Sequence, residues 1–228
     1  MKSLKARLTA EFIATFIMIF AGCGAIVIET LTGALGHAGV ALTWGFVVVA
    51  LIYTFGHISG AHMNPAVSIA FTVMKEFDKK ELPFYIVAQV LGASFAAFVL
   101  YALFIGEVKN MSELAYLGST LPRGTQMQAF IMEFILTFIL MLVICGSAVH
   151  GKAIKSFAGL AIGLTVGLEA MFAGPITMAS MNPARSFGPA IVSGNITDLW
   201  LYIVSTILGA ISAVFVYKIM QEKEEIES

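Results

Sequence analysis

A proline-containing phrase that occurs twice inside apolar sequence restricts the fold of this chain most strongly. The segment GHISGAHMNPAVSIA begins at residue 56, and GPITMASMNPARSFG begins at residue 174. A proline inside a membrane-length apolar stretch normally breaks a helix. Two interruptions at matched positions therefore indicate a built feature of the fold rather than chance.

The composition places both phrases in a membrane. Of the 228 residues, 59% are hydrophobic and 12% are charged, and the mean hydropathy is +0.91. Soluble domains carry about twice that charged fraction, so the sequence predicts an integral membrane protein. The net charge of −1 gives no field that would attract nucleic acid. No nucleic-acid partner is expected.

Apolar segments of two lengths can be distinguished. A membrane crossing needs roughly 20 residues, and six segments are close to that length: 8–28, 38–56, 83–105, 127–149, 157–173 and 199–219. Two shorter segments, 64–74 and 182–192, follow the repeated phrase. Each would form about 15 Å of helix, which is half the thickness of a bilayer.

The basic residues are divided unevenly between the two sides of the membrane. With the N-terminus inside, the outer loops hold only Lys109 and Arg123. The opposite segments hold ten Lys and Arg residues and comprise 1–7, 75–82, 150–156 and 218–228. Cytoplasmic loops carry such an excess, so both chain ends are expected in the cytoplasm. The remaining basic residue, Arg185, follows the second Asn-Pro-Ala directly.

Similarity between the two halves extends beyond the repeated phrase. The matched strings are Glu11-Phe12 with Glu133-Phe134, Cys23-Gly24 with Cys145-Gly146, and Leu91-Gly92-Ala93 with Leu208-Gly209-Ala210. Each half holds three spans, and an odd number of spans makes the halves face opposite ways. The sequence therefore predicts a single channel domain, 1–228, built from an inverted-topology repeat of approximately 8–105 and 127–219. The interrupted segments of such repeats point to the permeation site.

Each repeated phrase also holds the residues that begin a helix. Asparagine is a strong N-cap, and proline suits the first helical position because its missing N–H costs nothing there. We expect half-helices to begin at Asn64-Pro65-Ala66 and Asn182-Pro183-Ala184 and to meet by their positive dipole ends at the midplane. The approaches 57–63 and 174–181 would be non-helical, with free carbonyls along a water-filled cavity. A neutral solute can bond to these groups, whereas a cation meets the positive midplane and Arg185.

On these residues the chain resembles the aquaporin (major intrinsic protein) family, and within it the bacterial and plant nodulin-26-like members. The resemblance covers nearly the whole chain and rests on the paired Asn-Pro-Ala boxes, SGAH at 59–62, the AEF and MEF openings of the halves, and NPARS at 182–186. It implies an all-α integral membrane fold with six transmembrane helices plus two re-entrant half-helices. It also implies passive conduction of water and small uncharged solutes without a cofactor, and a homotetramer in the lipid bilayer. The short loops indicate a multi-pass protein of the plasma (inner) membrane.

The resemblance assigns a selectivity filter to Trp44, Ala170, Ala179 and Arg185. Strict water channels have Phe and His at the first two positions, whereas nodulin-26-like relatives have Trp followed by small residues. The set implies space for small polyols or neutral hydroxylated acids, such as metalloid acids, beside water. Ser186, where glycerol facilitators have Asp, argues against a standard glycerol facilitator.

A water-selective pore is the alternative to this wider filter. In that case a neighbouring side chain, Met171 or Phe172, would swing inward and refill the space beside the two alanines.

Three acidic residues lie within predicted spans. Glu11 and Glu133 are placed symmetrically, which favours a structural role in which each buried carboxylate accepts hydrogen bonds from backbone N–H groups of its re-entrant loop. Glu169, next to Ala170, is expected to turn away from the pore and bind a loop N–H; the alternative is that it biases Arg185 or an entering solute. Four widely spaced histidines and two separate cysteines predict no metal site.

Two further function classes remain to be compared with a channel. A proton-coupled secondary transporter also uses inverted repeats, but Glu11 and Glu133 are the only candidates for a titratable relay. An enzyme would need a paired nucleophile and base or a metal, and neither flanks the interrupted segments. The sequence predicts a passive channel.

Overall fold

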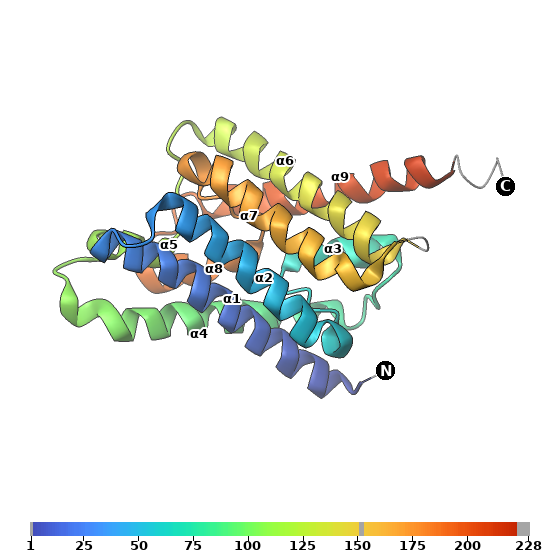
Figure 1. Ribbon diagram of the computed structural model, residues 1–228, viewed down its shortest axis with the longest axis horizontal. Coiled ribbons are helices and arrows are strands. Elements are labelled where there is room, and N and C mark those ends of the chain that lie inside the picture. The colour runs from blue at the N-terminus through green and yellow to red at the C-terminus, as the bar shows by residue number, and fades with distance from the viewer. Residues whose placement is uncertain (1, 151–152, 223–228) are drawn as a thin grey trace.

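The computed structural model describes residues 2–150 and 153–222, which are helical without a strand (Figure 1). Two of the lysines that were predicted to be cytoplasmic, Lys152 and Lys223, lie outside the described residues. The long helices are α1 (Leu4–Thr32), α2 (Gly36–Ser59), α4 (Leu82–Phe104), α6 (Gln126–Ile144), α7 (Ala158–Thr177) and α9 (Leu199–Glu222). The start of α1 and the end of α9 lie at the same end of the bundle, on the right in Figure 1.

Two shorter helices lie among the long ones and begin at the repeated phrase. Helix α3 (Pro65–Met74) is capped by Asn64, whose Oδ1 accepts a hydrogen bond from the N–H of Ala66 at 2.9 Å. Helix α8 (Pro183–Ser193) is capped by Asn182, whose Oδ1 accepts from Ala184 at 2.9 Å. Both helices begin with proline, because that position needs no N–H donor.

Glycine allows the closest helix contacts. A Cβ on Gly92 of α4 would lie 2.4 Å from the carbonyl oxygen of Phe12 in α1, and a Cβ on Gly209 of α9 would lie 2.3 Å from that of Phe134 in α6. Helices α2 and α7 meet in the same way, since a Cβ on Gly163 would lie 2.7 Å from the carbonyl oxygen of Gly45. Backbone contacts of this kind require residues without a side chain.

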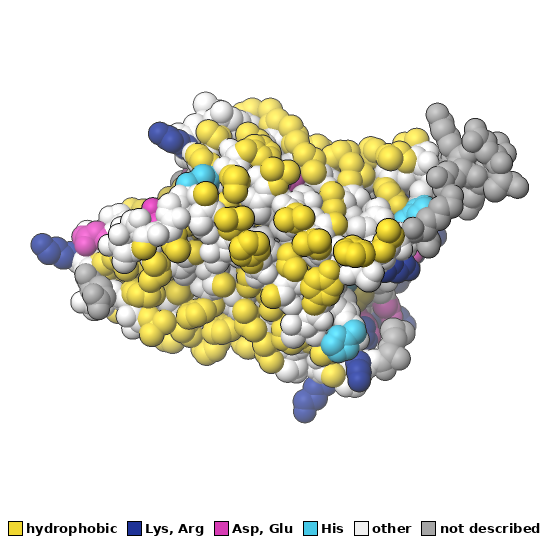
Figure 2. Space-filling view, in the orientation of Figure 1, with side chains coloured by type: hydrophobic (Ala, Val, Ile, Leu, Met, Phe, Trp, Pro, Cys, Tyr) yellow, Lys and Arg dark blue, Asp and Glu magenta, His cyan; other side chains and the backbone are white. Residues whose placement is uncertain are grey.

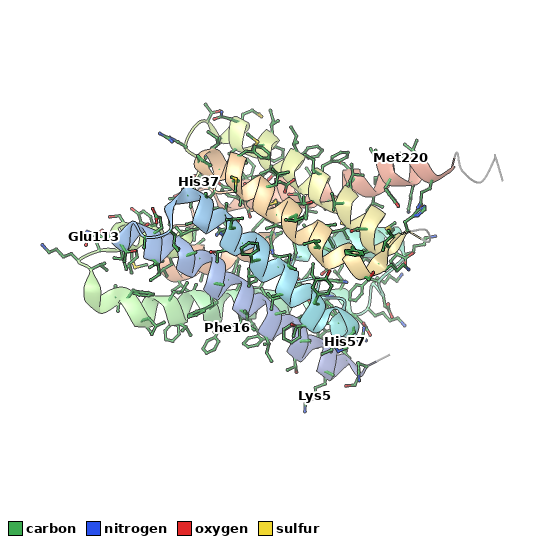
Figure 3. All side chains as sticks on the ribbon, in the orientation of Figure 1. Lys5, Phe16, His37, His57, Glu113 and Met220 are labelled. Atoms are coloured by element: carbon green, nitrogen blue, oxygen red, sulfur yellow. The ribbon has the colours of Figure 1, made fainter. Side chains whose placement is uncertain are left out.

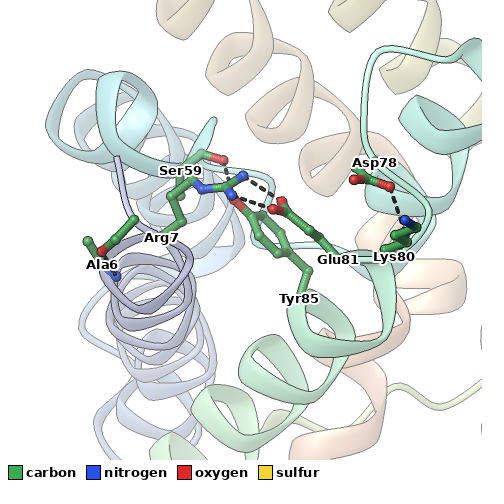
Figure 4. Close-up of polar contacts among 8 residues, drawn as sticks. Ala6, Arg7, Ser59, Asp78, Lys80, Glu81 and Tyr85 are labelled. Atoms are coloured by element: carbon green, nitrogen blue, oxygen red, sulfur yellow. Dashed lines mark hydrogen bonds and ion pairs between the residues drawn. The ribbon is translucent and has the colours of Figure 1, made fainter. Parts of the chain in front are cut away.

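The surface fits a lipid environment. Figure 2 shows hydrophobic side chains over the middle of the visible face, with charged side chains at its two ends. Six helices are long and apolar enough to cross a membrane. At the end of the bundle where α1 begins, the guanidinium of Arg7 binds both carboxylate oxygens of Glu81 at 2.5 and 2.6 Å and so ties α1 to the start of α4 (Figure 4).

The helices around the re-entrant loops are longer than expected. Helix α2 continues to Ser59 and α7 to Thr177, so the non-helical approaches are shorter than the predicted 57–63 and 174–181. Helix α7 passes through Pro175, which lies in its last turn. The carbonyl that Pro175 deprives of an N–H donor, that of Met171, accepts a hydrogen bond from the side chain of His37 instead.

The remaining elements lie in connecting segments. Helix α6 ends in a π-helical turn, η3 (Cys145–Val149). The outer segment between α4 and α6 holds η1 (Ile105–Glu107), η2 (Met111–Leu114) and α5 (Ala115–Gly118), and η4 (Lys155–Phe157) precedes α7.

Candidate pore and selectivity filter

A cavity of about 120 Å³ lies between the two re-entrant loops and the walls of the bundle. Both capping asparagines line it, and so do Trp44, Ala170, Ala179 and Arg185. The rest of its wall is mostly apolar and includes Met18, Val48, Ile52, Val67, Leu140, Ile144, Ile162 and Val166. Polar groups therefore occupy few places along an otherwise apolar passage.

The two capping asparagines hold the re-entrant loops together. The Nδ2 of Asn64 donates to the carbonyl of Met181 at 2.7 Å, and the Nδ2 of Asn182 donates to the carbonyl of Met63 at 2.8 Å. The starts of α3 and α8 consequently meet. An amide nitrogen has two N–H donors, so each asparagine keeps one for a solute in the cavity.

The loop backbones that precede these asparagines are strained. Ala61 and Met63 have φ values of 48° and 49°, and the equivalent Ala179 and Met181 have values of 44° and 55°. Non-glycine residues in this left-handed region cost about 1–3 kcal/mol each and persist only where the surroundings determine them. The loops therefore need strong anchors.

Glu11 is the anchor of the first loop. One carboxylate oxygen accepts from the N–H of His62 at 2.9 Å and the other from the N–H of Met63 at 2.8 Å. The side chains of Ser59 and Gln89 donate to the same carboxylate at 2.7 and 2.8 Å. This buried charge is surrounded by donors.

Glu133 holds the second loop in the same manner. It accepts from the N–H of Ser180 at 2.8 Å, from the N–H of Met181 at 2.9 Å and from the hydroxyl of Thr177 at 2.7 Å. The carboxylate is fully buried. Neither Glu11 nor Glu133 is among the residues that line the cavity.

Arg185 lies at the outer side of the cavity and is 1% exposed. Its Nη1 donates to the carbonyl of Gly118 at 2.7 Å, and its Cζ lies 4.8 Å from the ring centroid of Trp44. Its Nε and Nη2 have no hydrogen-bond partner among the described residues. The guanidinium therefore has unused donors beside an aromatic face.

The part of the cavity wall that Ala170 and Ala179 form carries little bulk. Ala170 and Ala179 line the cavity, whereas Met171 and Phe172 are 40% and 53% exposed and do not. A second cavity of about 230 Å³ adjoins Trp44 and Ala170 and is otherwise lined mainly by residues of α1, α2 and α7. The space beside the alanines is not refilled by either of these neighbours.

Comparison with known proteins assigns this architecture to a family. The model of the major intrinsic protein family matches residues 1–217. The chain belongs to the major intrinsic protein family. The resemblance predicted from the two Asn-Pro-Ala boxes is thereby confirmed.

Relatives and solved structures agree with this membership. The chain is 48% identical to aquaporin NIP3-1 of Arabidopsis thaliana, over 98% of this chain and 70% of that protein. It is 45% identical to nodulin-26 of Glycine max, over 94% and 78% of the two chains. The aquaglyceroporin from Plasmodium falciparum superposes with a TM-score of 0.85 at 30% identity, covering 94% of this chain and 96% of that one. This major intrinsic protein is a multi-pass membrane channel for water and small uncharged solutes.

Glu169 turns away from the cavity as expected, but the hydrogen bond expected for it is not formed. Its carboxylate does not bind a loop N–H: both oxygens are buried and have no hydrogen-bond partner among the described residues. The loop N–H groups of Ser180 and Met181 are already bound by Glu133. Glu169 is 1% exposed and does not line the cavity.

Several residues around the filter have no clear signature in the sequence. The carbonyl of Gly118, which binds Arg185, comes from the outer segment after α4, and only its φ of 71° distinguishes it. Gln89 gives one amide hydrogen bond to Glu11 at 2.8 Å and another to Ser68 at 3.0 Å. A polar residue in the middle of an apolar span could have identified Gln89.

A wide mouth of about 510 Å³ opens at the end of the pore where α2 ends. His62 lies between the mouth and the cavity, with its Nδ1 3.0 Å from the hydroxyl of Ser68 and its ring against Phe71. His57, Glu76 and Lys155 line the mouth itself. Along this route, charged side chains line the mouth, and the wall of the cavity beyond it is mostly apolar as far as the two asparagines.

Proposed function

We propose that this channel passes small polyols and neutral hydroxylated acids in addition to water, and that it excludes ions and protons. Trp44, Ala170, Ala179 and Arg185 form its selectivity filter. The observation that carries the proposal is the empty side of the filter: two alanines line it, and neither Met171 nor Phe172 fills it.

The filter offers two kinds of surface to a solute. The unpartnered Nε and Nη2 of Arg185 can donate to hydroxyl oxygens, and the Trp44 ring provides an apolar wall. A polyol has a hydrocarbon edge and a hydroxylated edge, so each finds a matching surface. A cation would have to leave its water shell beside a buried guanidinium, which is unfavourable.

The two Asn-Pro-Ala boxes form the second selective point of the channel. Asn64-Pro65-Ala66 and Asn182-Pro183-Ala184 begin the two half-helices, whose positive ends oppose cations and protons. Glu11 and Glu133 are structural and hold the loops in their strained conformation. The two halves, approximately 8–105 and 127–219 of a single domain 1–228, are inverted repeats, which is supported by their matching hydrogen bonds.

The experiment is stopped-flow light scattering of the reconstituted protein. Wild-type vesicles should shrink rapidly in sucrose and should admit glycerol faster than protein-free vesicles. Replacing Ala170 by His should depress glycerol entry far more than water flow, because the imidazole fills the vacant side. Glycerol entry no faster than in protein-free vesicles would overturn the polyol proposal and leave a water-selective channel.

A passive channel also differs from the other classes in what it cannot do. Solute that accumulates against its gradient when a proton gradient is applied would identify a proton-coupled transporter. The relatives of this chain are channels, and the proposal includes no enzymatic activity. The proposal also includes a homotetramer in the plasma (inner) membrane with both chain ends in the cytoplasm. Cross-linking in the membrane tests the tetramer, and labelling of single cysteines from either side of the membrane tests the location of the chain ends.

A further inference from the structure

Helix α7 carries the filter residue Ala170 and has a backbone defect one residue further on. In an α-helix the carbonyl of Met171 would accept a hydrogen bond from the N–H of residue 175, but residue 175 is proline and has no N–H. The carbonyl of Met171 therefore has no donor of its own helix. Met171 is 40% exposed, so this carbonyl can take either water or a side-chain donor as its partner.

His37 supplies that partner from a different helix. Its Nε2 lies 2.6 Å from the carbonyl oxygen of Met171. A carbonyl can only accept, so Nε2 carries the hydrogen and donates it. Replacing Gly174 would interfere, because a Cβ there would lie 3.0 Å from Cε1 of the His37 ring. A proline that removes a donor and a glycine that admits the imidazole lie in the same turn of α7.

His37 belongs to α2, the helix that also carries the filter residue Trp44. His37 lies in the first turn of α2, and Trp44 follows seven residues later, which is two turns along the same face of a helix. His37, Trp44, Ala170 and Gly174 line the outer cavity of about 230 Å³ together. Figure 3 shows His37 at the outer end of the bundle, at the start of α2. The hydrogen bond therefore joins the two helices on which Trp44 and Ala170 face the solute path.

Deeper in the bundle, the spacing of these helices is fixed by a different contact. Gly45 and Gly163 bring the two backbones together there. The same contact continues to Gly167, whose Cβ would lie 3.3 Å from the Cα of Gly45 and 3.5 Å from the carbonyl oxygen of Ala41. On α2 this contact holds the backbone next to Trp44, whereas on α7 Ala170 lies beyond it, between Gly167 and the carbonyl that binds His37. The position of Ala170 relative to Trp44 therefore depends on the outer part of α7, which the His37 bond holds.

We propose that His37 is a positioning residue of the filter: by donating to the Met171 carbonyl that Pro175 leaves free, it holds α7 against α2 and limits the size of the solutes that pass. The inference rests on the proposed filter. Without the His37 donor, the Met171 carbonyl forms a hydrogen bond with water instead, and the outer end of α7 moves away from α2. The gap between Trp44 and Ala170 then widens, and larger solutes enter more readily relative to water.

The test compares two replacements of His37 in proteoliposomes. His37→Leu removes the donor at similar bulk, whereas His37→Gln retains an amide N–H at about the reach of Nε2. His37→Leu should raise the permeability to a four-carbon polyol, erythritol, relative to water by about fivefold, the factor that one net hydrogen bond controls. His37→Gln should keep the wild-type ratio. An unchanged ratio in His37→Leu, or an equal rise in both variants, would overturn the proposal.

A second comparison identifies the atom through which His37 acts. Pro175→Ala restores the N–H donor that the Met171 carbonyl lacks. The double variant Pro175→Ala/His37→Leu should therefore have the same erythritol-to-water permeability ratio as Pro175→Ala alone. The same fivefold rise in both backgrounds would show that His37 acts by another route and would overturn the proposal. Monodispersity and melting temperature in detergent establish that each variant is folded. Glycerol entry through the wild-type protein tests the proposed function separately, because His37→Leu should admit erythritol even if the wild-type filter passes water alone.

Discussion

The two halves of this channel hold their re-entrant loops with the same device but do not carry the same residues around the pore. Glu11 and Glu133 each bind two consecutive loop N–H groups. The hydroxyl of Tyr85 donates to the carbonyl of Ser59 at 2.9 Å, and its counterpart Tyr202 donates to the carbonyl of Thr177 at 3.0 Å. Figure 4 shows the Tyr85 bond beside Arg7 and Glu81. The support of the loops is therefore duplicated.

The halves differ at positions near the solute path. The 118 residues that separate Asn64 from Asn182 also pair Val67 with Arg185 and Leu51 with Glu169. The charge of Arg185 thus has an apolar counterpart in the first half, and so does the unpartnered carboxyl group of Glu169. The comparison shows that duplication preserves what holds the backbone, while the two faces of the pore have acquired different chemistry.

The largest expected effect is the loss of a loop anchor. Glu11→Gln and Glu133→Gln each replace one carboxylate oxygen by an amide NH₂ group, which cannot accept the two hydrogen bonds that this oxygen receives. Hydrogen bonds to a charged group are worth about 1.5–3 kcal/mol each, so losing two should destabilise the protein by about 3–6 kcal/mol. Similar losses of melting temperature in detergent for both variants would support equal anchoring. A loss confined to one variant would show that the two loops are held differently.

The glycine contacts should produce the next largest effect. Gly92→Ala and Gly209→Ala would each place a Cβ less than 3 Å from a backbone carbonyl oxygen of the neighbouring helix. Overpacking of this kind costs about 1–3 kcal/mol, measured as a lower melting temperature. Gly146→Ala is the matched control, because no described neighbour lies within 4 Å of the position that its Cβ would take. Destabilisation by the control equal to that of the other two would contradict the steric explanation.

Replacing Arg185 by Val tests the charge difference between the halves, since it gives the second half the residue type of Val67. The variant should relax the exclusion of cations, because the outer fixed charge is gone while the two half-helix ends remain. We expect cation permeability relative to water to rise by about tenfold, which corresponds to about 1.4 kcal/mol. Voltage-clamp currents and water flow in the same preparation provide the measurement. A large wild-type cation conductance would refute the ion-exclusion proposal.

The smallest expected effect concerns Glu169. Glu169→Leu gives the second half the residue of Leu51 and removes a buried carboxyl group that has no partner among the described residues. Burial of an unpartnered polar group costs about 1–3 kcal/mol, and the different shape of leucine offsets part of this, so a gain of about 1 kcal/mol is expected. The melting temperature should rise while the glycerol-to-water ratio stays constant. A changed ratio would instead assign Glu169 a role in selectivity.

Much of this fold was accessible from sequence because the relevant signals are local. Apolar length located all six spans, and the Asn-Pro pairs located both half-helices, since capping depends on adjacent residues. The predicted ends of α2 and α7 came too early, because both helices continue into the segments that the repeated phrase indicated as non-helical approaches. The carbonyl that Pro175 leaves without a donor accepts a hydrogen bond from His37, which is far away in the sequence.

The sequence by itself determined the doubled architecture, the two interrupted segments and the family, because repeats, hydropathy and motifs are carried by neighbouring letters. Only the tertiary structure decided which distant groups meet. It pairs Arg185 with the carbonyl of Gly118, gives each capping asparagine a carbonyl of the opposite loop, and leaves Glu169 without a partner among the described residues. These outcomes depend on how α1 to α9 pack around one cavity. Which polar group is satisfied in the interior is a property of that packing, and no short stretch of sequence encodes it.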